Sequence, residues 1–346
     1  MRFADLTTLK VGGEIATFRE ATTTPEVIEL VKGSWREHDE MIALGGGSNL
    51  LASDDEYSGT VIKISTRGIT QSDAGSSDGK VLLTVQAGEL WDDVARFACE
   101  SGLSGIEALS GIPGSAGAAP VQNIGAYGQE LCETLESIEF LDERDSEIKT
   151  LSASELDLGY RTSSLKQGRR GVVLSICLAL ERTELSAPIA YSQLAAKLGV
   201  ELGSRVELAE ARQAVLELRA SKGMLLQAGD PDSVSAGSFF TNPIVSENFA
   251  RNLPKDWPHW ILDPEAPESA VKLSAAWLIE HSGIHRGFSL PGSSAAVSSK
   301  HTLALTNRGN ATAEEIMQLA RYIHLRVLSQ FGVALQPEPV LLGLSL

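Results

Sequence analysis

A chain of 346 residues is longer than a single hydrophobic core usually organises, so we expect two or three compact units. Hydrophobic residues make up 43% of the chain and charged residues 21%, a balance that can fill a core and that excludes wholesale disorder. The formal net charge of -16 argues against a nucleic-acid-binding protein, which needs a positive surface to neutralise phosphates. An anionic ligand would therefore have to bind at a local site.

The N-terminal segment MRFADLTTLKVGGE lacks the apolar core of a signal peptide, and nowhere do about 18 uninterrupted apolar residues make a membrane span. We therefore expect a cytoplasmic protein without membrane insertion. The cysteines Cys99, Cys132 and Cys177 are scattered and odd in number, which is a poor basis for disulfides. We predict that all three are free, buried, small hydrophobic side chains.

Strands alternate with helices over about the first 225 residues. Thr24 is predicted to cap a helix that has Pro25 in its first turn, and residues 41–44 are predicted to form a short buried strand before a glycine loop. Two further helices are predicted, one at about 206–220 and one whose apolar face ends near Gly102. The residues of that face are Trp91, Val94, Ala95 and Ala98. Further strands are predicted at 61–65, 81–88, 137–142 and 171–180.

The composition changes to turn-forming residues after residue 226, so we place a domain boundary near residue 225. Residues 270–283 are then predicted to form one helix. Thr312 and Glu315 are predicted to form a capping box for another helix, which ends at Gly332. The tail beyond Gly332 is predicted to be extended and to rejoin an earlier sheet.

The stretch GGGSNL at residues 45–50 follows the strand predicted at 41–44. Glycines can adopt positive φ, so successive N–H groups can converge into an anion-binding nest that suits a phosphate, with Ser48 and Asn49 adding polar side chains. A tight turn between two elements is the alternative explanation. The loop is neither a Walker loop, which needs Gly-Lys-Ser/Thr, nor a Rossmann fingerprint, because Leu50 occupies the third glycine position.

The tract GIEALSGIPGSAGAAPVQNIGAYG at residues 105–128 contains six glycines and only one charged residue, Glu107. Bare, neutral backbone lets a large flat group approach closely, and backbone dipoles with hydroxyls such as Ser115 can neutralise a diphosphate. Close packing of strand on strand is the alternative explanation. Two separated glycine tracts together indicate an extended dinucleotide.

Five motifs occur in order along the chain. They are TTLKVGG at 7–13, GGGSNLL at 45–51, GIPGSAGAAPVQNIGAYG at 111–128, GYRTS at 159–163 and AGSFFTNP at 236–243. In this order they resemble the UDP-N-acetylenolpyruvoylglucosamine reductase family, flavoenzymes of peptidoglycan precursor synthesis. The later stretches VKLSAAWLIEHSG and LTNRGNATAEEI fit the same family, so the resemblance covers nearly the whole chain.

The resemblance implies an α+β fold: a two-subdomain FAD-binding fold of the vanillyl-alcohol-oxidase type, followed by a C-terminal α+β substrate-binding domain. Residues 1–70, rejoined by 333–346, would form the first FAD-binding subdomain. Residues 71–225 would form the second, and 226–332 the substrate-binding domain. FAD would be bound non-covalently by two groups of residues, which are Gly45, Gly46, Gly47, Ser48, Asn49 and Leu50, and Ile112, Pro113, Ser115, Gly117, Ala118, Asn123 and Gly125.

The implied reaction passes hydride from NADPH to FAD and then to the enolpyruvyl ether of UDP-N-acetylglucosamine enolpyruvate, giving UDP-N-acetylmuramate. An enolate develops on the substrate, so a fixed cation and a proton donor are needed beside it. Arg161 resembles the family arginine that holds this enolate, and its planar fork suits a carboxylate. Ser238 resembles the serine that protonates the α-carbon. Glu338 lies before Pro339 on a stiff extended backbone and resembles the glutamate that assists the enol.

Three more residues match family positions that meet the UDP-sugar: Tyr191, Lys222 and Asn242. The Tyr191 segment resembles the family branch that has a tyrosine-bearing loop over the substrate, which implies a lid that excludes water. The chain departs from the family at Thr241, where lysine is common. We expect no metal, because His281 and His285 lack a third ligand at a consistent spacing, and we expect a monomer. The resemblance implies that NADPH and the sugar nucleotide take turns at one site, and the absence of a Gly-x-Gly-x-x-Gly motif agrees with this.

Two alternatives remain open at this stage. An FAD oxidase of the same fold would keep the glycine tracts but would have no reason to cluster Arg161, Ser238 and Glu338. A non-catalytic flavin-binding paralogue would not need all three side chains. The mutual position of these residues and the reactivity of the flavin distinguish the three readings.

Overall fold

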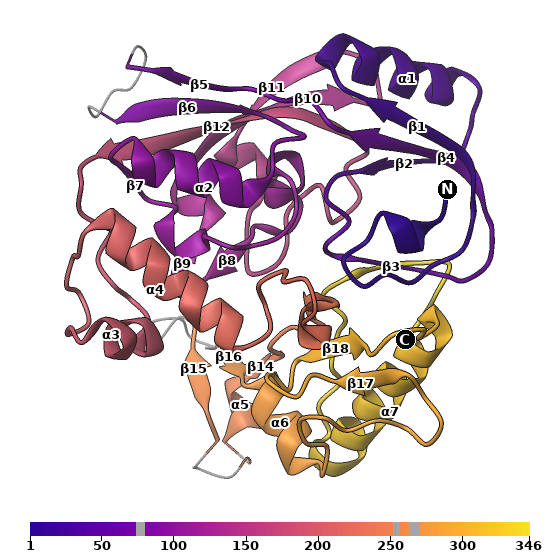
Figure 1. Cartoon of the computed structure of the whole chain (residues 1–346), viewed down its shortest axis with the longest axis vertical. Helices are drawn as coiled ribbons and strands as arrows, with labels where there is room; N and C mark the ends of the chain where they lie inside the picture. Colours follow the sequence, from indigo (N-terminus) through magenta and orange to yellow (C-terminus); the bar gives the residue numbers. More distant parts are fainter. Residues whose placement is uncertain (74–79, 252, 254–256, 263–269) are drawn as a thin grey trace. The chain divides into compact units, whose positions relative to one another are not determined.

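The computed structural model describes residues 1–73, 80–251, 253, 257–262 and 270–346, and the contacts within it divide the chain into two compact units (Figure 1). The first unit consists of Met1, Ile15–Gly47 and Tyr57–Ser221. The second consists of Arg2–Glu14, Ser48–Glu56 and Lys222–Leu346. The chain therefore passes from one unit to the other inside the glycine loop, after Gly47. The finer division into three domains stays a prediction.

A three-stranded parallel sheet opens the first unit, with β4 (Tyr57–Ile64) between β1 (Ile15–Ala21) and β2 (Met41–Leu44). Helix α1 (Thr24–Arg36) lies across this sheet, because its buried valines pack against apolar residues of β4 (Figure 1). The parallel order of β1 and β2 requires a crossover, which α1 provides. The glycine loop begins where β2 ends.

Two predictions for this sheet were wrong. The cap of α1 is Thr23 rather than Thr24: the Thr23 hydroxyl accepts the N–H of Glu26, and the Glu26 carboxylate accepts the N–H of Thr23 at 3.1 Å. Strand β2 exists over the predicted residues, but only Leu44 is buried in it. The reason is its position, since β2 forms an edge of the sheet.

A six-stranded antiparallel sheet forms the larger part of the first unit. Helix α2 (Trp91–Glu100) lays its predicted apolar face, Trp91 with Val94, Ala95 and Ala98, into the core beside this sheet. The face is confirmed, because all four side chains are buried. The strands run in the order β11 (Ile148–Ser152), β10 (Leu135–Asp142), β12 (Gly171–Arg182), β6 (Val81–Gln86) and β5 (Ile69–Ser72), and β7 (Leu103–Ser104) also pairs with β12.

Short elements fill the rest of the first unit and carry most of its candidate site. The longer glycine tract contains two 3-10 helices and enters a small hairpin, and two helices follow the large sheet. These elements are η2 (Glu107–Leu109), η3 (Ala116–Gln122), β8 (Gly125–Ala126), β9 (Gln129–Glu130), η4 (Leu131–Glu133), η5 (Ala153–Leu156), α3 (Ser192–Leu198) and α4 (Leu208–Ser221).

The second unit contains three small sheets around one core. In the first, β18 (Ala304–Asn307) lies between β13 (Ser235–Ser238) and β17 (Ala295–Val297). The extended tail supplies β19 (Val340–Leu342), which pairs in parallel with β3 (Leu50–Ala52) just after the glycine loop. The third sheet has β16 (Ala270–Leu273) between β14 (Ile244–Ser246) and β15 (His259–Ile261).

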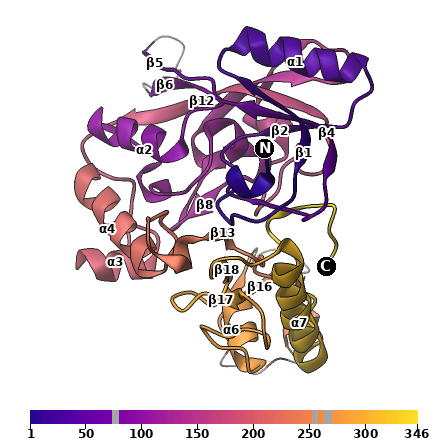
Figure 2. The same cartoon turned by 45° about the vertical axis from the view of Figure 1, so that its right-hand side comes forward.

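Helix α7 (Ala313–Phe331) packs against β17 and β18, and α6 (Ala275–His281) lies beside it (Figure 2). The predicted capping box of α7 is confirmed, as is its end at Gly332, where φ is 67°. The prediction of one helix over 270–283 was wrong, because its first four residues form β16 with alternating burial and Ser274 caps α6. The remaining helices of this unit are η1 (Phe3–Asp5), η6 (Pro231–Ser233) and α5 (Glu247–Ala250).

The cysteine prediction was wrong in part. All three cysteines are free, but Cys132 is exposed and Cys99 and Cys177 are only half-buried. Cys132 is exposed because it lies in a surface 3-10 turn, η4, rather than on a core-facing strand. Burial raises the pKa of the Cys99 thiol to about 12, so this thiol is unreactive at neutral pH.

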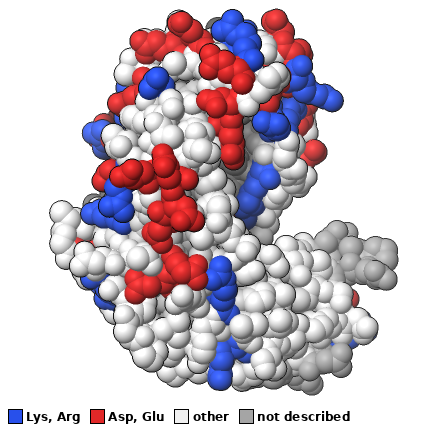
Figure 3. All heavy atoms as spheres, turned by 90° about the vertical axis from the view of Figure 1, so that its right-hand side faces the viewer, with Lys and Arg blue, Asp and Glu red and all other residues white. Residues whose placement is uncertain are grey.

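The surface charge and the helices can be compared with the sequence arguments against a nucleic-acid-binding protein and against a membrane-spanning protein. On the face drawn in Figure 3, acidic side chains gather in clusters with basic side chains between them, so the net charge of -16 does not form one uniform acidic surface there. Within the described parts of the chain, no helix combines the length and the apolar character needed to cross a membrane.

Candidate functional site

The two glycine tracts meet within the first unit, and their contact leaves no room for side chains. A Cβ atom on Gly46 would lie 2.6 Å from Cα of Gly114, and one on Gly45 would collide with the Ser115 hydroxyl. On Gly117, a Cβ atom would lie 2.5 Å from Cβ of Ala87. Backbone therefore packs directly on backbone at Gly46 and Gly114, and all three positions, 45, 46 and 117, require glycine for close approach.

The prediction that three successive glycines adopt positive φ was wrong for Gly45 and Gly46. Only Gly47 is left-handed, with φ of 61°. A nest built from a run of glycines in this conformation is therefore absent from this loop of the described chain. What the loop offers a ligand is bare backbone beside the second tract, with the Ser115 hydroxyl at the contact.

The second tract is fixed by Trp91 and by three charged residues, Asp92, Arg212 and Arg219, to which the sequence alone assigned no role. Asp92 on α2 accepts the N–H of Gly111 at 2.6 Å and pairs with both terminal nitrogens of Arg212 at 2.7 and 2.9 Å. Arg219 on α4 is buried and donates from Nε to the carbonyl oxygen of Gly111 at 3.0 Å. Trp91 donates its backbone N–H to Gly114 at 3.1 Å. The loop that holds Ile112 and Pro113 is therefore shaped before any ligand arrives.

Asn123 closes the other end of this tract. It has a left-handed backbone with φ of 45° and is fully buried. Its Oδ1 accepts the N–H of Cys132 at 2.9 Å, and its Nδ2 donates to the Glu130 carboxylate at 3.0 Å and to the Gly159 carbonyl at 3.1 Å. The side chain thus ties the β8–β9 hairpin to the turn that carries Arg161.

Arg161 lies in that turn, where Gly159 and Thr162 exchange backbone hydrogen bonds of 3.1 and 3.2 Å. Its own φ is 55°, a conformation that costs free energy for a residue with a side chain and that is often found at functional sites. The guanidinium donates from Nη2 to the carbonyl oxygen of Gly125 at 2.7 Å and lies 5.4 Å from the ring centre of Tyr160. The arginine is therefore held by the second glycine tract.

Tyr191 lies at the N-terminal end of α3, with 37% of its surface exposed. Its ring meets the ring of Tyr127 edge to face, with 5.6 Å between centroids. The segment before it is anchored by the buried carboxylate of Glu107, which accepts the N–H of Ala187 at 2.5 Å and the N–H of Gly105 at 2.7 Å. The tyrosine-bearing segment is therefore attached to the start of the second glycine tract.

The second unit brings Ser238 and Glu338 onto neighbouring segments. The N–H of Glu338 donates to the carbonyl oxygen of Phe239 at 2.8 Å, and the Glu338 carbonyl oxygen accepts from Nδ2 of Asn49 at 3.3 Å. Ser238 ends β13 directly after Gly237, whose φ is 74°, and its side chain is half-buried. Glu338 in the tail is therefore bonded through its backbone to the residue after Ser238 and to the side chain of Asn49, in the loop after β2.

The two remaining predicted substrate residues also lie in the second unit. Asn242 accepts the N–H of Ala275 at 3.0 Å, at the start of α6. Lys222 precedes Gly223 and lies close enough to His301 to affect its titration: burial and then the charge of Lys222 lower the pKa of His301 to about 4. His301 is therefore neutral at physiological pH, and the positive charge of this region comes from lysine and arginine side chains. The sequence analysis did not single out His301.

Within the described ranges, no group of three or more His, Cys, Asp or Glu side chains is arranged to hold a metal ion. The ring of His281 stacks on Trp277, with 3.7 Å between centroids and 15° between planes. Its Nδ1 lies 2.9 Å from the Trp277 carbonyl oxygen, which gives this histidine a structural role at the end of α6.

Comparison with known proteins decides the family. A relative named UDP-N-acetylenolpyruvoylglucosamine reductase from Leifsonia xyli subsp. xyli is 53% identical, covering 99% of this chain and 98% of its own. A second relative of the same name, from Saccharopolyspora erythraea, is 47% identical, and the match covers 99% of this chain and 95% of the relative. The chain belongs to the UDP-N-acetylenolpyruvoylglucosamine reductase family. The family predicted from the motifs is therefore confirmed.

Two domain models and a solved structure agree with this membership. The C-terminal domain of the reductase family matches residues 230–342, and an FAD binding domain matches residues 15–152. The crystal structure of the reductase from Thermus caldophilus aligns with a TM-score of 0.66 at 26% identity, covering 99% of this chain and 97% of that one. The predicted α+β combination of an FAD-binding fold with a C-terminal domain is confirmed.

Proposed function

We propose that the protein is an NADPH-dependent flavoenzyme that reduces the enolpyruvyl ether of UDP-N-acetylglucosamine enolpyruvate to UDP-N-acetylmuramate, in the synthesis of peptidoglycan precursors. The observation that supports this most directly is the hydrogen bond between Glu338 and Phe239. It holds the proposed proton donor, Ser238, and the proposed enol-assisting residue, Glu338, on adjacent segments. An oxidase of the same fold has no need for this pair. A non-catalytic paralogue would have no need for it either.

The residues of the first unit fit FAD. Gly45, Gly46 and Gly117 present backbone without side chains: a Cβ atom on Gly45 or Gly46 would fill the contact between the two tracts, and one on Gly117 would collide with Ala87. The remaining predicted contacts, from Ile112 to Gly125, lie on a loop already fixed by protein hydrogen bonds. Such a loop can meet a diphosphate with backbone dipoles rather than with lysine, which agrees with the acidic composition of the chain. When bound, FAD would accept hydride from NADPH and return it through N5 to the β-carbon of the enolpyruvyl group.

The protein side chains would handle the charge and the proton. Hydride addition leaves negative charge on the α-carbon and carboxylate of the substrate, and Arg161 would hold this enolate with its planar fork. Ser238 would donate its hydroxyl proton to the α-carbon, which completes the saturated lactyl ether, and would then regain a proton from solvent. NADPH would already have left as NADP⁺ after the first half-reaction. Glu338, held at its backbone by Phe239 and Asn49, would assist the enol.

Binding of the UDP-sugar would use the remaining predicted residues. Lys222 supplies a positive charge for the diphosphate beside a neutral His301. Asn242 supplies an amide near the start of α6. Tyr191, supported by Tyr127, would cover the substrate as part of a lid. We expect NADPH to occupy the same site before the sugar nucleotide, in a cytoplasmic monomer.

The experiment that tests this function follows the flavin absorbance of the purified protein under anaerobic conditions. NADPH is added first and the enolpyruvyl UDP-sugar second. Bleaching by NADPH and rapid recovery with the sugar nucleotide is the expected result. Bleaching without recovery would point to the oxidase alternative. A protein that binds no flavin on reconstitution would leave only a non-flavin binding function.

The Ser238→Ala variant separates the two half-reactions. Flavin reduction by NADPH should stay near the wild-type rate, while recovery with the enolpyruvyl sugar should slow by about 10² to 10⁴, the usual contribution of a general acid. Ser329→Ala, an exposed position on α7, is the matched control and should change neither step. Equal slowing of both steps in Ser238→Ala would remove the serine from its proposed role.

A further inference from the structure

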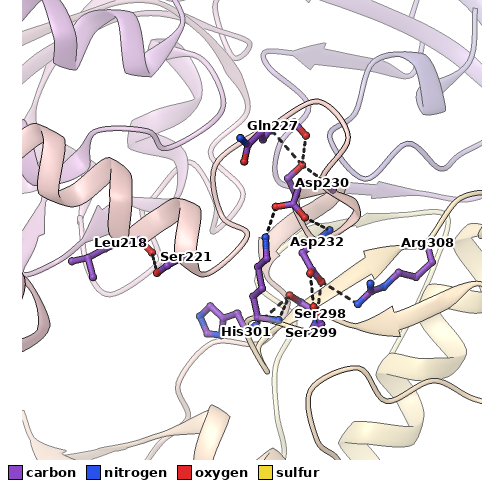
Figure 4. A network of polar contacts seen from close by, with 11 residues as sticks. Leu218, Ser221, Gln227, Asp230, Asp232, Ser298, Ser299, His301 and Arg308 are labelled. Atoms are coloured by element: carbon purple, nitrogen blue, oxygen red, sulfur yellow. Dashed lines mark hydrogen bonds and ion pairs between the residues drawn. The ribbon is translucent and has the colours of Figure 1, made fainter.

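Asp232 is a buried carboxylate for which the proposed reaction gives no role. It lies in η6 just before β13, with only 3% of its surface exposed (Figure 4). Its two oxygens accept the backbone N–H of Ser299 at 2.8 Å, the Ser299 hydroxyl at 2.6 Å and a guanidinium N–H of Arg308 at 3.0 Å. A buried charge with this many donors is fixed in position.

The protonation state of Asp232 suits this network. Burial raises the pKa of its carboxyl, but hydrogen bonds from Ser299 and Ser298 and the charge of Arg308 outweigh burial and bring the pKa below its usual value. The group is therefore ionised at neutral pH. Removing its charge would leave the guanidinium of Arg308, which is half-buried, without its carboxylate partner.

The hydrogen bonds of Asp232 connect η6 with the residues that follow β17 and β18, and Asp232 also packs against the segment that carries Lys222. Ser299 follows β17, Arg308 follows β18, and Asp232 precedes the strand that ends at Ser238. A Cβ atom on Gly223 would lie 2.7 Å from Cβ of Asp232, so the residue after Lys222 packs directly on the Cβ and backbone of Asp232. One side chain thus touches the neighbour of Lys222 and anchors the strand of Ser238.

We propose that Asp232 is a positioning residue that holds Lys222 and Ser238 in one arrangement before substrate binds. This inference rests on the proposed function, because those two residues are its substrate contacts. Ordering the lysine segment and β13 in advance lowers the entropy that binding must otherwise overcome. Asp232 would therefore act on substrate affinity without touching substrate.

A neighbouring ion pair provides the comparison. Lys300 donates to Asp230 at 2.7 Å and so connects the same two chain segments, but its side chain is 37% exposed (Figure 4). Exposed pairs contribute little to stability, because water screens them and the lysine loses side-chain entropy. The Lys300→Gln variant therefore breaks a bond between these segments while leaving the donors to the Asp232 carboxylate, Ser299 and Arg308, in place.

The test compares the steady-state kinetics of Asp232→Asn with those of the wild type and of Lys300→Gln. In Asp232→Asn the KM for the enolpyruvyl UDP-sugar should rise about 10- to 100-fold, the scale expected when a remote change displaces reacting groups by about 1 Å. FAD content should stay at the wild-type level, because the three glycines at 45–47, the second glycine tract and Arg161 belong to the first unit, whereas Asp232 belongs to the second. Amide hydrogen exchange at Ser299 should speed up, while Lys300→Gln should match the wild type in all three measurements.

An Asp232→Asn protein with a wild-type KM would overturn the proposal. If that variant does not fold, Ser299→Ala replaces it: this change removes one donor to Asp232 and leaves the backbone donor in place. A smaller rise in KM is then expected, and no rise would overturn the proposal. A wild-type protein that shows no recovery of flavin absorbance with the enolpyruvyl sugar would refute the proposed function itself, and this outcome is distinguishable because it appears before any variant is made.

Discussion

Arg161 donates from Nη2 to the carbonyl oxygen of Gly125 at 2.7 Å while its backbone stays in the left-handed region with φ of 55°. The hydrogen bond fixes a costly backbone conformation, so the guanidinium is aimed by the second glycine tract. Because Gly125 is also a predicted flavin contact, the positions of the arginine and of the flavin site are linked through one peptide unit. The first prediction follows from this link.

Arg161→Lys should keep the positive charge and lose the planar fork that reaches Gly125 and a carboxylate together. We expect recovery of the reduced flavin by the enolpyruvyl sugar to slow by about 10²- to 10³-fold, as when one stabilising donor is removed from a developing anion. The amount of bound FAD should not change. Arg170→Lys, at a position with 77% of its side chain exposed, is the control. A rate for Arg161→Lys equal to that of this control would contradict the assignment.

Gly46→Ala should separate the two glycine tracts, because its Cβ atom would lie 2.6 Å from the backbone of Gly114. Backbone cannot move aside as a flexible side chain can, so we expect a loss of about 1–3 kcal/mol in the free energy of unfolding. The ratio of flavin to protein should fall as well. Urea unfolding and visible absorbance measure the two effects.

Gly33→Ala is the matched control for this substitution. Gly33 lies inside α1 with nothing within 4 Å of a Cβ atom, so alanine should raise stability there by about 0.5–1 kcal/mol. If Gly46→Ala is as stable as Gly33→Ala and binds FAD normally, the close approach of the tracts is not needed for stability or for FAD binding.

Glu107→Gln should release the segment that carries Tyr191. The amide side chain replaces one acceptor oxygen with a donor, so either Ala187 or Gly105 loses the partner of its buried N–H. An unsatisfied buried donor costs about 1–3 kcal/mol, and hydrogen exchange of the Ala187 amide should become correspondingly faster. The exposed Glu201→Gln is the control. Unchanged exchange at Ala187 would show that the segment is held by other contacts.

The acid stability of the protein should depend on Asp92. Burial raises the pKa of Asp92, but hydrogen bonds from Arg212 and from the N–H of Gly111 bring it below its usual value in the folded state. A carboxyl with a depressed folded pKa stabilises the protein above its unfolded pKa of about 3.9, and this contribution is lost as the pH falls through the folded pKa.

Asp92→Asn should therefore lower the free energy of unfolding at about pH 7 and make little difference well below about pH 4. Urea unfolding of both proteins across this range measures the effect. A difference between them that stays constant with pH would mean that the charge of Asp92 does not matter and that only its shape does.

Local patterns predicted those elements whose structure depends on nearby residues. The apolar face of α2 and the capping box of α7 both involve residues within a few positions of each other, and both are confirmed. Among the wrong predictions, the cap of α1 is a local error of one position, whereas the helix at 270–283 fails where distant contacts decide. Residues 270–273 join a sheet because β14 and β15 flank them. In this strand the buried Val271 and Leu273 alternate with half-buried residues, the period of two that is typical of a strand.

The sequence by itself determined the family, since five ordered motifs identify it without any coordinates. It also determined which residue types the chemistry needs. Only the tertiary structure decided why Gly45 and Gly46 must be bare, because the reason is contact with a second tract about 70 positions away rather than their own φ. Likewise Ser238 and Glu338 lie 100 positions apart, and one backbone hydrogen bond, from Glu338 to the neighbouring Phe239, holds their segments together. Contacts between segments so distant produce no periodic pattern of residues in the sequence. They can therefore be identified only from the folded structure.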